Sequence, residues 1–526
     1  MQSKFNRAWL LPILSGFFIG TSYIPFPPWA SLFGLVPLWL FWSQQTTLKA
    51  IILSGVLTSF IFSLIGFNWV TYLLHEFAHL PWFLACLGMV VFALIAHLFV
   101  PVAGLLWFTG KRLGLYSNNS KLSIMVMGLL TALALWLLPM LFKWNFGYAW
   151  YGSKIPVYHL AEYIGFSGLS LLTVLANIPL YFAWQARKND NGKAILKWVA
   201  MAFMLLNVLG LSTKAWLPTA DNSLNALLVQ ANIGNSQKVT AQFGKGGYNE
   251  IISQYQKVTS QGLIEHAGEQ VDFILWSETA FPSLLNKSYQ DSYYAQRLRH
   301  YIKQAAVPLI TGSYAKDEQT GLITNSLFVV DNKGDVQPDY YSKSILLAFG
   351  EYIPGEQTFP ILRELMPMVG NFGRGDGPKK LLSLGDYKIG AQICYESLYP
   401  DFSKSLADLG AQFIVNVTND SWYGTWQEPY QHMVMTLARA VETRRPLLRV
   451  TNTGISTVVL ASGEILEQSP MQETWAGLYK IPYVTEPKAT FYQRYYYLLP
   501  SLLAMLLALL LLNGLRTRYH IKSSGI

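Results

Sequence analysis

The segment Tyr387–Tyr399, YKIGAQICYESLY, carries the thiol of Cys394 near its middle. Apolar residues at positions 389, 391 and 393 alternate with residues that are more polar or small, which is the period-two pattern of a half-buried β-strand. We expect a strand that runs up to Cys394, followed by a turn and a short helix. A thiol at a strand end and beside Glu396 can act as a nucleophile, although a buried packing cysteine would show the same local pattern.

The composition of the 526-residue chain is that of an integral membrane protein that carries a domain of soluble character. Apolar residues make up 52% of the chain and charged residues only 13%, about half the charged share of an ordinary soluble domain. Most of this deficit falls in the first 215 residues. We therefore predict three parts: a seven-helix transmembrane region at 1–215, an α/β domain at 222–486, and a transmembrane helix with a cytoplasmic tail at 496–526.

Apolar segments of spanning length define the predicted membrane helices. They lie at 8–24, 50–74, 81–107, 122–142, 160–184, 194–211 and 498–515, and a shorter one lies at 29–42. Counting the shorter segment as a span places thirteen Lys and Arg residues on one side of the membrane, while the short loops of the other side hold only Lys143 and Lys154. Because cytoplasmic loops are enriched in positive residues, this predicts eight helices, cytoplasmic termini and an extracytoplasmic α/β domain.

The net charge of +9 does not indicate a nucleic-acid partner, because much of the excess flanks the apolar segments and is explained by topology. The two cysteines, Cys86 and Cys394, form neither a disulfide framework nor a zinc motif. Cys86 lies inside an apolar segment and is expected to pack there. Cysteines outside the cytoplasm are usually oxidised in pairs, so an unpaired Cys394 in such a domain favours a chemical role for its thiol.

One motif in the membrane half resembles a metal site. His75, Glu76 and His79 match the H-E-x-x-H pattern, in which two histidines one helical turn apart bind zinc and the glutamate activates water. Pro81 follows at once, which leaves little helix to hold both ligands. We expect an interfacial polar cap, with an intramembrane zinc protease as the alternative. The glycine-rich segment 373–377 does not follow a predicted strand, so we expect no bound nucleotide. We also predict no metal and no other cofactor.

From residue 222 onward, short apolar segments alternate with helical ones, which is the pattern of a layered α/β domain with mixed sheets. Strands are predicted at 226–230, 273–276, 308–312, 326–331, before Cys394, and at 412–417, 446–451 and 456–460. Helices are predicted at about 248–265 and 430–443.

Three ionisable residues lie at or near strand ends in this domain. Glu278 follows the strand at 273–276, Lys343 lies among apolar residues in YYSKSILLAFGEYIP, and Cys394 ends its own strand. Taken singly, a capping glutamate, a snorkelling lysine and a packing cysteine are the plainer interpretations. Together they can form an acyl-transfer trio. Glu278 would take the thiol proton, and Lys343 would stabilise the oxyanion and lower the pKa of the thiol.

The contexts of these residues are W-S-E-T-A-F-P, Y-S-K, F-G-E-Y-I-P and I-C-Y-E, and the three lie 65 and 51 residues apart. This arrangement resembles the nitrilase superfamily. With the predicted helices on either side, the whole chain resembles the apolipoprotein N-acyltransferase family of the Gram-negative inner membrane. Further matching stretches are N-F-G-Y at 145–148, T-N-D-S-W-Y-G at 418–424, Q-H at 431–432, R-P-L-L-R at 445–449 and T-N-T-G-I-S at 451–456.

The resemblance implies an αββα sandwich with Glu278 as general base, Lys343 as oxyanion stabiliser and Cys394 as nucleophile. It also implies that three further residues support the site: Glu351, Tyr395 and Glu396. Members of the family often carry a tryptophan in the loop after the first strand of this domain. The corresponding residue of this chain is Val239, so the resemblance does not say how its site closes over lipid.

Apolar loops beside the trio point to a lipid substrate. The segments 280–282, 345–349 and 359–372 suit dipping into a bilayer or binding an acyl chain. Packing between the domain and the membrane helices would produce the same pattern. Three aromatic residues are candidates for the lipid entrance: Trp422, Tyr423 and Trp426.

The resemblance implies a two-step, ping-pong reaction. Cys394 would take an acyl chain from a phospholipid as a thioester, and the α-amino group of a lipoprotein's N-terminal diacylglyceryl-cysteine would then accept it as an amide. A thioester splits one difficult transfer into two easier steps. The alternatives are a membrane-anchored amidase with the same trio and a transporter. The near absence of charged residues within the predicted helices argues against an ion-coupled transporter.

Overall fold

The computed structural model describes residues 7–77, 80–116, 120–234, 237–238, 240, 246–367 and 369–523, with side chains up to Arg516 in the last helix. The chain divides into two compact units. The first contains residues 1–71, 81–216 and 494–526, and the second contains residues 72–80 and 217–493. Val239 and His79, which the sequence analysis singled out, lie outside the described residues.

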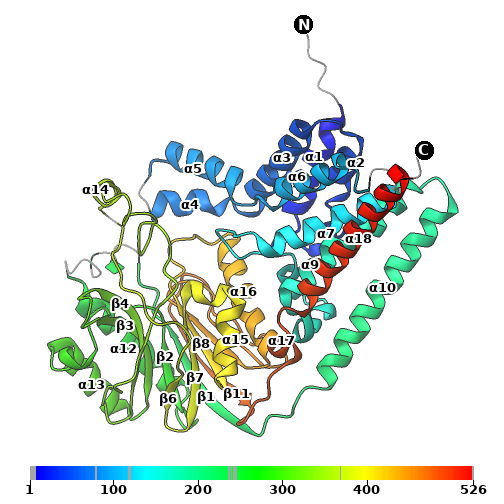
Figure 1. Cartoon of the computed structure of the whole chain (residues 1–526). Coiled ribbons are helices and arrows are strands. Elements are labelled where there is room, and N and C mark those ends of the chain that lie inside the picture. The colour runs from blue at the N-terminus through cyan, green and yellow to red at the C-terminus, as the bar shows by residue number, and fades with distance from the viewer. Residues whose placement is uncertain are drawn as a thin grey trace. The chain divides into compact units, whose positions relative to one another are not determined.

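The first unit is helical (Figure 1). Its elements are η1 (Arg7–Trp9), α1 (Leu10–Gly20), η2 (Pro28–Leu32), α2 (Val36–Gln44), α3 (Leu48–Gly66), the start of α4 (Trp69–Glu76), α5 (Trp82–Ile95), α6 (Phe99–Arg112), α7 (Ser120–Leu137), α8 (Gly147–Gly152), η3 (Pro156–Leu160), α9 (Ala161–Gln185), α10 (Asp190–Ala215) and α18 (Leu498–Ser523).

Among the described residues, six helical segments are long and apolar enough to cross a membrane: Leu48–Gly66, Trp82–Arg112, Ser120–Leu137, Pro156–Gln185, Asp190–Ala215 and Leu498–Arg516. The predicted membrane character is therefore confirmed. α1 has 11 residues and α2 has 9. At 1.5 Å per residue they extend about 17 Å and about 14 Å, against a bilayer core of about 30 Å. The count of eight spanning helices stays a prediction.

Small residues allow α1 and α3 to approach closely. A Cβ atom on Gly16 would lie 2.8 Å from Cβ of Ile61, and one on Gly20 would lie 2.8 Å from Cβ of Ile65. The four-residue spacing puts both glycines on one face of α1, as in many helix pairs of membrane proteins. An alanine at either position would push the two helices apart.

The second unit is built on two β-sheets. The six-stranded sheet has the order β11-β1-β2-β3-β4-β5, and the five-stranded sheet has the order β10-β9-β8-β7-β6. The strands are β1 (Asn222–Gln230), β2 (Phe273–Trp276), β3 (Leu309–Lys316), β4 (Ile323–Val330), β5 (Tyr341–Ser342), β6 (Leu382–Leu384), β7 (Tyr387–Ile393), β8 (Phe413–Thr418), β9 (Leu447–Thr451), β10 (Thr457–Val459) and β11 (Trp475–Tyr483). The central strands β1–β3 and β7–β9 run parallel within their sheets.

Helices cover the outer faces of both sheets and complete an αββα sandwich (Figure 1). α12 packs on β1 and β11 with α13 beside it, whereas α15 and α16 pack on β7 and β9. Between the sheets, the ring of Phe273 stacks on that of Phe413 with centroids 6.0 Å apart. The helices are α12 (Tyr248–Glu265), η4 (Lys287–Tyr289), α13 (Tyr293–Ala305), α14 (Ile361–Leu365), η5 (Cys394–Leu398), α15 (Pro400–Asp408), α16 (Glu428–Thr443) and α17 (Phe491–Arg494).

The predicted strands and helices of this unit are confirmed, with ends shifted by a few residues. The short helix expected after Cys394 is present as η5 and α15, whereas β5, β6, β11 and α13 were not predicted. β5 and β6 have 2 and 3 residues, too few to show a period. β11 is half-buried along its first four residues, and its pairing along the whole of β1 is a long-range contact that no local pattern encodes.

Candidate active site

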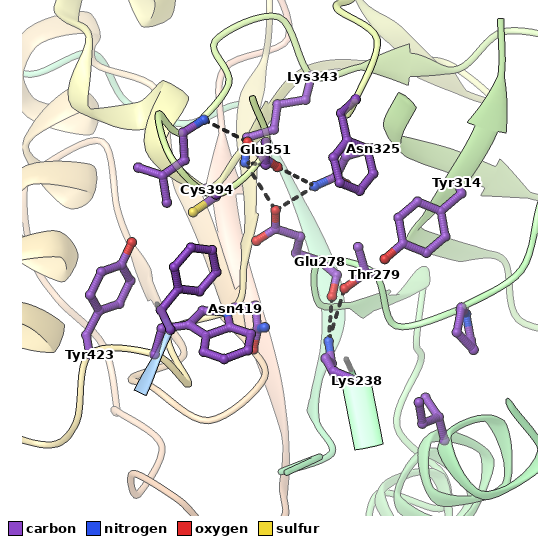
Figure 2. Close-up of a pocket in the computed structure, with 17 residues that line it drawn as sticks. Lys238, Glu278, Thr279, Tyr314, Asn325, Lys343, Glu351, Cys394, Asn419 and Tyr423 are labelled. Atoms are coloured by element: carbon purple, nitrogen blue, oxygen red, sulfur yellow. Dashed lines mark hydrogen bonds and ion pairs between the residues drawn. The ribbon is translucent and has the colours of Figure 1, made fainter. Parts of the chain in front are cut away.

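The predicted trio meets at one edge of the sandwich, where strands end. Glu278 follows β2 by two residues, Lys343 directly follows β5, and Cys394 directly follows β7. All three line one cavity of about 100 Å³. Figure 2 shows the thiol of Cys394, the carboxylate of Glu278 and the ammonium group of Lys343 gathered around this space.

The cavity has both polar and apolar walls. Its polar side chains belong to Lys238, Glu278, Thr279, Tyr314, Asn325, Lys343, Glu351, Cys394, Asn419 and Tyr423. Its apolar side chains belong to Phe77, Ile251, Pro282, Leu347, Phe372 and Trp422. Pro282, Leu347 and Phe372 come from the three apolar loops that the sequence analysis associated with lipid. A carbonyl group can therefore meet the polar groups while a hydrocarbon chain contacts the apolar wall.

Lys343 joins two carboxylates. Its Nζ lies 3.3 Å from Oε1 of Glu278 and 2.9 Å from Oε1 of Glu351, and only 1% of the residue is exposed. Burial alone would lower the pKa of Lys343, but the charges of Glu278 and Glu351 outweigh burial and raise this pKa well above its ordinary value. Lys343 is therefore a permanent positive charge in the cavity, as stabilisation of an oxyanion requires.

Asn325 holds the two glutamates in place. Its Nδ2 donates to Oε1 of Glu278 at 2.7 Å and lies 3.4 Å from Oε1 of Glu351. The other carboxylate oxygen of Glu351 accepts from the main-chain N of Leu347 at 2.8 Å. The sequence analysis missed Asn325, because an asparagine at the start of an apolar strand shows no charge pattern. It also missed Tyr314, Thr279 and Asn419, which reach the cavity from β3 and from loops.

Cys394 occupies a strained turn between β7 and η5. Its φ angle is 52°, a left-handed conformation that residues other than glycine adopt rarely. The turn is held by hydrogen bonds to the carbonyl oxygen of Cys394, from Oγ of Ser397 at 3.0 Å and from Nδ2 of Asn416 at 3.3 Å. The residue is only 6% exposed. The strain is thus maintained by side chains of η5 and β8, and it directs the thiol into the cavity.

Burial raises the pKa of the Cys394 thiol far above its ordinary value, and the charge of Glu278 adds to the rise. The charge of Lys343 and a hydrogen bond from Thr418 act in the opposite direction. Lys343 thus lowers the pKa of the thiol as expected, but burial and the charge of Glu278 outweigh its effect, because the thiolate would lie in a low-dielectric site. A thiol that stays protonated needs a base as it attacks, and Glu278 lies beside it.

Glu396 ties the Lys343 segment to the Cys394 turn. Its Oε1 accepts hydrogen bonds from the main-chain N of Ser344 at 2.7 Å, from Oγ of Ser344 at 3.0 Å, from N of Ile345 at 3.2 Å and from the hydroxyl of Tyr341 at 2.5 Å. Its Oε2 accepts from N of Ile393 at 2.9 Å. Glu396 is fully buried but does not line the cavity, so it acts on the site through the backbone segments that it joins.

The remaining predicted residues divide between the cavity and its surroundings. Tyr395 packs edge-on against Tyr399, with ring centroids 5.5 Å apart, and is not among the lining residues. Trp422 and Tyr423 line the cavity, whereas Trp426 does not and is 52% exposed. The structure therefore brings two of the three candidate aromatic residues to the site.

Gly312 and Lys238 both contact the main chain at Glu278. A Cβ atom on Gly312 would lie 2.6 Å from the carbonyl oxygen of Ser277 and from N of Thr279. Nζ of Lys238 donates to the carbonyl oxygen of Glu278 at 2.8 Å and to Oγ1 of Thr279 at 3.3 Å. The sequence analysis examined the segment around Lys238 only for its neighbour at position 239.

One buried group has the donor types of a metal site. Ligand atoms of Asp420, Glu428 and His432 lie within 4.8 Å of one another. However, Nη2 of Arg449 lies 2.7 Å from Oδ2 of Asp420, and Nδ1 of His432 lies 3.0 Å from its Oδ1. The guanidinium group already balances the carboxylate charge and would repel a divalent cation. This arrangement is a buried network of ionisable side chains, and Asp420 precedes Trp422 and Tyr423 by two and three residues.

The H-E-x-x-H motif begins at the end of α4, whose last residue is Glu76. Nδ1 of His75 lies 2.8 Å from the carbonyl oxygen of Leu80, which agrees with the expected polar cap. His79 lies outside the described residues.

Family models match both halves of the chain. Residues 228–478 match the carbon-nitrogen hydrolase model, and residues 15–179 match the model of the apolipoprotein N-acyltransferase N-terminal domain. Among solved structures, an amidase from Nesterenkonia sp. AN1 is similar over 48% of this chain and 92% of its own, with 16% identity and a TM-score of 0.36.

Relatives from two bacteria match nearly the whole chain. The apolipoprotein N-acyltransferase of Bdellovibrio bacteriovorus is 42% identical over 91% of this chain and 89% of its own length. That of Geobacter metallireducens is 28% identical over 89% of this chain and 88% of its own. The chain thus belongs to the apolipoprotein N-acyltransferase family, and its α/β domain has the fold of the nitrilase superfamily.

Proposed function

We propose that the chain is an apolipoprotein N-acyltransferase. It would transfer an acyl chain from a phospholipid, through a thioester at Cys394, to the α-amino group of the N-terminal diacylglyceryl-cysteine of an apolipoprotein, the last step of lipoprotein maturation. The observation that carries the proposal is the shared, largely buried cavity of Glu278, Lys343 and Cys394. Six apolar helices of spanning length among the described residues support a donor that resides in the bilayer.

In the first step, the Cys394 sulfur attacks the ester carbonyl of the phospholipid while Glu278 takes the thiol proton. Lys343 stabilises the negative charge that develops on the carbonyl oxygen. The C–O bond then breaks, and Glu278 returns the proton to the leaving alkoxide, which departs as a lysophospholipid. Because burial keeps the pKa of the thiol high, proton transfer and attack occur together, and the chemistry requires no cofactor.

In the second step, the acceptor amine attacks the thioester. A C–N bond forms, the C–S bond breaks and the thiol of Cys394 is restored. Glu351 and Asn325 keep Glu278 and Lys343 in position through their hydrogen bonds. Glu396 and Tyr395 support the turn that carries the nucleophile. The apolar wall limits access of water, which would otherwise hydrolyse the thioester.

We further propose that the protein lies in the inner membrane of a Gram-negative bacterium with both termini in the cytoplasm. Residues 1–215 and 496–526 would form the membrane region, and residues 222–486 the periplasmic domain. The distribution of Lys and Arg over the short loops supports this orientation. Exposed apolar residues between β5 and β6, such as Phe349 at 52% and Phe359 at 61%, would contact lipid.

Intact mass spectrometry tests the covalent mechanism. We expect purified wild-type protein incubated with phospholipid to gain the mass of one acyl chain and to lose it when a diacylglyceryl lipopeptide is added. Cys394→Ala should show no adduct, while Cys86→Ala, the matched control at the second cysteine, should behave like wild type. An adduct that persists in Cys394→Ala would contradict the thioester.

The fate of the acyl chain separates the proposed transferase from an amidase or lipase with the same trio. The transferase forms an N-acylated lipopeptide, whereas a hydrolase releases free fatty acid at the same rate with and without acceptor. Complementation of a strain depleted of its own apolipoprotein N-acyltransferase provides the test in cells. Wild type should restore growth, and Glu278→Ala, Lys343→Ala and Cys394→Ala should not. Rescue by all four proteins would contradict both the proposed function and the proposed site.

A further inference from the structure

Two buried lysines flank Glu278, and their surroundings differ. Nζ of Lys343 contacts the carboxylates of Glu278 and Glu351. Lys238 is only 7% exposed, yet its Nζ contacts two neutral oxygens, the carbonyl of Glu278 and Oγ1 of Thr279. Within the described part of the chain no carboxylate lies within 4.0 Å of Lys238 Nζ, and the remaining residues include no Asp or Glu.

The hydrogen bonds of Lys238 match those of a neutral amine. A neutral amine has two N–H donors and one lone pair, whereas an ammonium group has three donors and no acceptor. Among the described residues, the two oxygens at 2.8 Å and 3.3 Å accept two hydrogen bonds from Nζ. The third position is then a lone pair in the neutral form, and an unsatisfied buried donor in the charged form. Because Lys238 lines the cavity, a ligand there can reach the third position of Nζ, and in the neutral form it would meet the lone pair.

The charges around the cavity lead to the same assignment. Burial lowers the pKa of Lys238 to about 7, although the charge of Glu278 acts in the opposite direction. The titratable groups that share the cavity with Lys238 are Glu278, Tyr314, Lys343, Glu351, Cys394 and Tyr423. One lysine that stays charged and one that loses its proton near neutral pH form a pair suited to separate acid–base tasks.

The second half of the proposed reaction has a proton that the trio does not account for. The acceptor α-amino group, whose ordinary pKa is about 8, begins largely as –NH₃⁺ and ends as an amide N–H, so two protons leave the nitrogen. One of them passes through Glu278 to the departing sulfur of Cys394. The other must go to a second base before the nitrogen can attack.

We propose that Lys238 is this second base and that it takes the first proton from the α-ammonium group of the acceptor. Lys238 then carries the charge until it releases the proton to water, and the free amine forms the C–N bond while the C–S bond breaks. This role rests on the proposed acyl transfer and extends it, since it assigns the acceptor amine a place beside Lys238 and the main chain of Glu278. Lys238 is thereby a catalytic residue of aminolysis.

Two substitutions of Lys238 distinguish a general base from a residue that only donates structural hydrogen bonds. Lys238→Arg keeps a cation and several N–H donors but cannot accept a proton, and Lys238→Gln keeps an N–H₂ group without basicity. Lys257→Arg and Lys257→Gln, at an exposed position of α12, are the matched controls. For each variant, intact mass measures the rate of Cys394 acylation by phospholipid. Quenched-flow measurement with saturating diacylglyceryl lipopeptide gives the rate of transfer from the preformed acyl-enzyme, between pH 5.5 and 9.

We expect both Lys238 variants to slow transfer from the acyl-enzyme by about 100-fold, the usual size of general-base catalysis, and at least tenfold more than they slow acylation. Wild-type transfer should rise with pH through an inflection near 7, where Lys238 loses its proton. In the variants this inflection should move up by about one unit, to the pKa of the α-amino group itself.

The role of Lys238 is overturned if Lys238→Arg transfers at the wild-type rate, or if both half-reactions slow to the same extent. The latter result would mean that Lys238 only holds the main chain of Glu278. An inflection near 7 that persists in both variants would overturn the role as well. If wild-type protein forms the acyl-enzyme but never acylates the lipopeptide, the proposed function itself fails, and that outcome is visible without any Lys238 variant.

Discussion

Replacing Glu396 by glutamine tests whether this buried carboxylate holds the catalytic segments together. Oε1 of Glu396 accepts hydrogen bonds from Tyr341, Ser344 and Ile345, and Oε2 accepts from N of Ile393 at 2.9 Å. Glutamine has the same shape but offers only one acceptor oxygen. If that oxygen stays with the Lys343 segment, the new N–H₂ group faces the N–H group of Ile393, donor against donor.

The expected loss of stability follows from the replacement of a carboxylate oxygen by an N–H₂ group. One hydrogen bond to a charged group contributes about 1.5–3 kcal/mol, and a buried donor left without an acceptor adds a similar cost, so we expect a loss of about 3 kcal/mol. For a domain of this size each kcal/mol lowers Tm by about 2–4 °C, which gives a fall of about 6–12 °C. Because Ile393 precedes Cys394 and Ser344 follows Lys343, we also expect Cys394 acylation to slow at least about tenfold.

Thermal unfolding in detergent, followed by tryptophan fluorescence, measures Tm, and intact mass measures the rate of acylation. Glu464→Gln is the matched control, because Glu464 is exposed in a turn and should keep both values. A Glu396→Gln variant with Tm within about 1 °C of wild type and acylation within about twofold would refute the reasoning. It would show that the two backbone segments keep their places without the carboxylate.

Three further substitutions test other contacts of the site. Lys343→Met removes the cation between Glu278 and Glu351, and we expect acyl-adduct formation to slow at least about 10³-fold. Lys316→Met, at an exposed lysine, is the control. If Lys343→Met slows adduct formation by less than about tenfold, Lys343 does not stabilise the oxyanion. Asn325→Leu keeps the side-chain volume but removes the hydrogen-bond donor to Glu278. Urea unfolding should show about 1–3 kcal/mol less stability, and acylation of Cys394 should be slower. Full activity of this variant would mean that Glu278 does not need the hydrogen bond from Asn325. Gly312→Ala places a Cβ atom 2.6 Å from the oxygen of Ser277 and should displace Glu278 and slow acylation about 100-fold. Gly234→Ala, where a Cβ atom meets no atom of the described residues within 4 Å, should leave the rate of acylation unchanged. Equal rates for the two alanine variants would refute a tight fit at Gly312.

Local sequence patterns were sufficient for much of the fold. Apolar segments of spanning length revealed the membrane region, a period-two segment revealed β7, and short apolar segments revealed β1 to β4 and β8 to β10. Two-residue β5 and the half-buried β11 escaped detection, because short strands and long-range pairing leave little periodicity. The spanning character of the region at 29–42 stays a prediction, since its helix α2 has only 9 residues.

The order and local context of Glu278, Lys343 and Cys394 are properties of the chain itself, and they were sufficient to predict that the three side chains share one site. Tertiary structure set the surroundings of each of these groups. Burial, which depends on neighbours distant in sequence, outweighs the lowering effect of Lys343 on the pKa of the thiol and lowers the pKa of Lys238. Asn325 and Lys238 join the site only because the start of β4 and the segment after the end of β1 lie at the same edge of the sheet. The sequence shows which residue types are present, whereas the distances between their side chains and their removal from water set their protonation states.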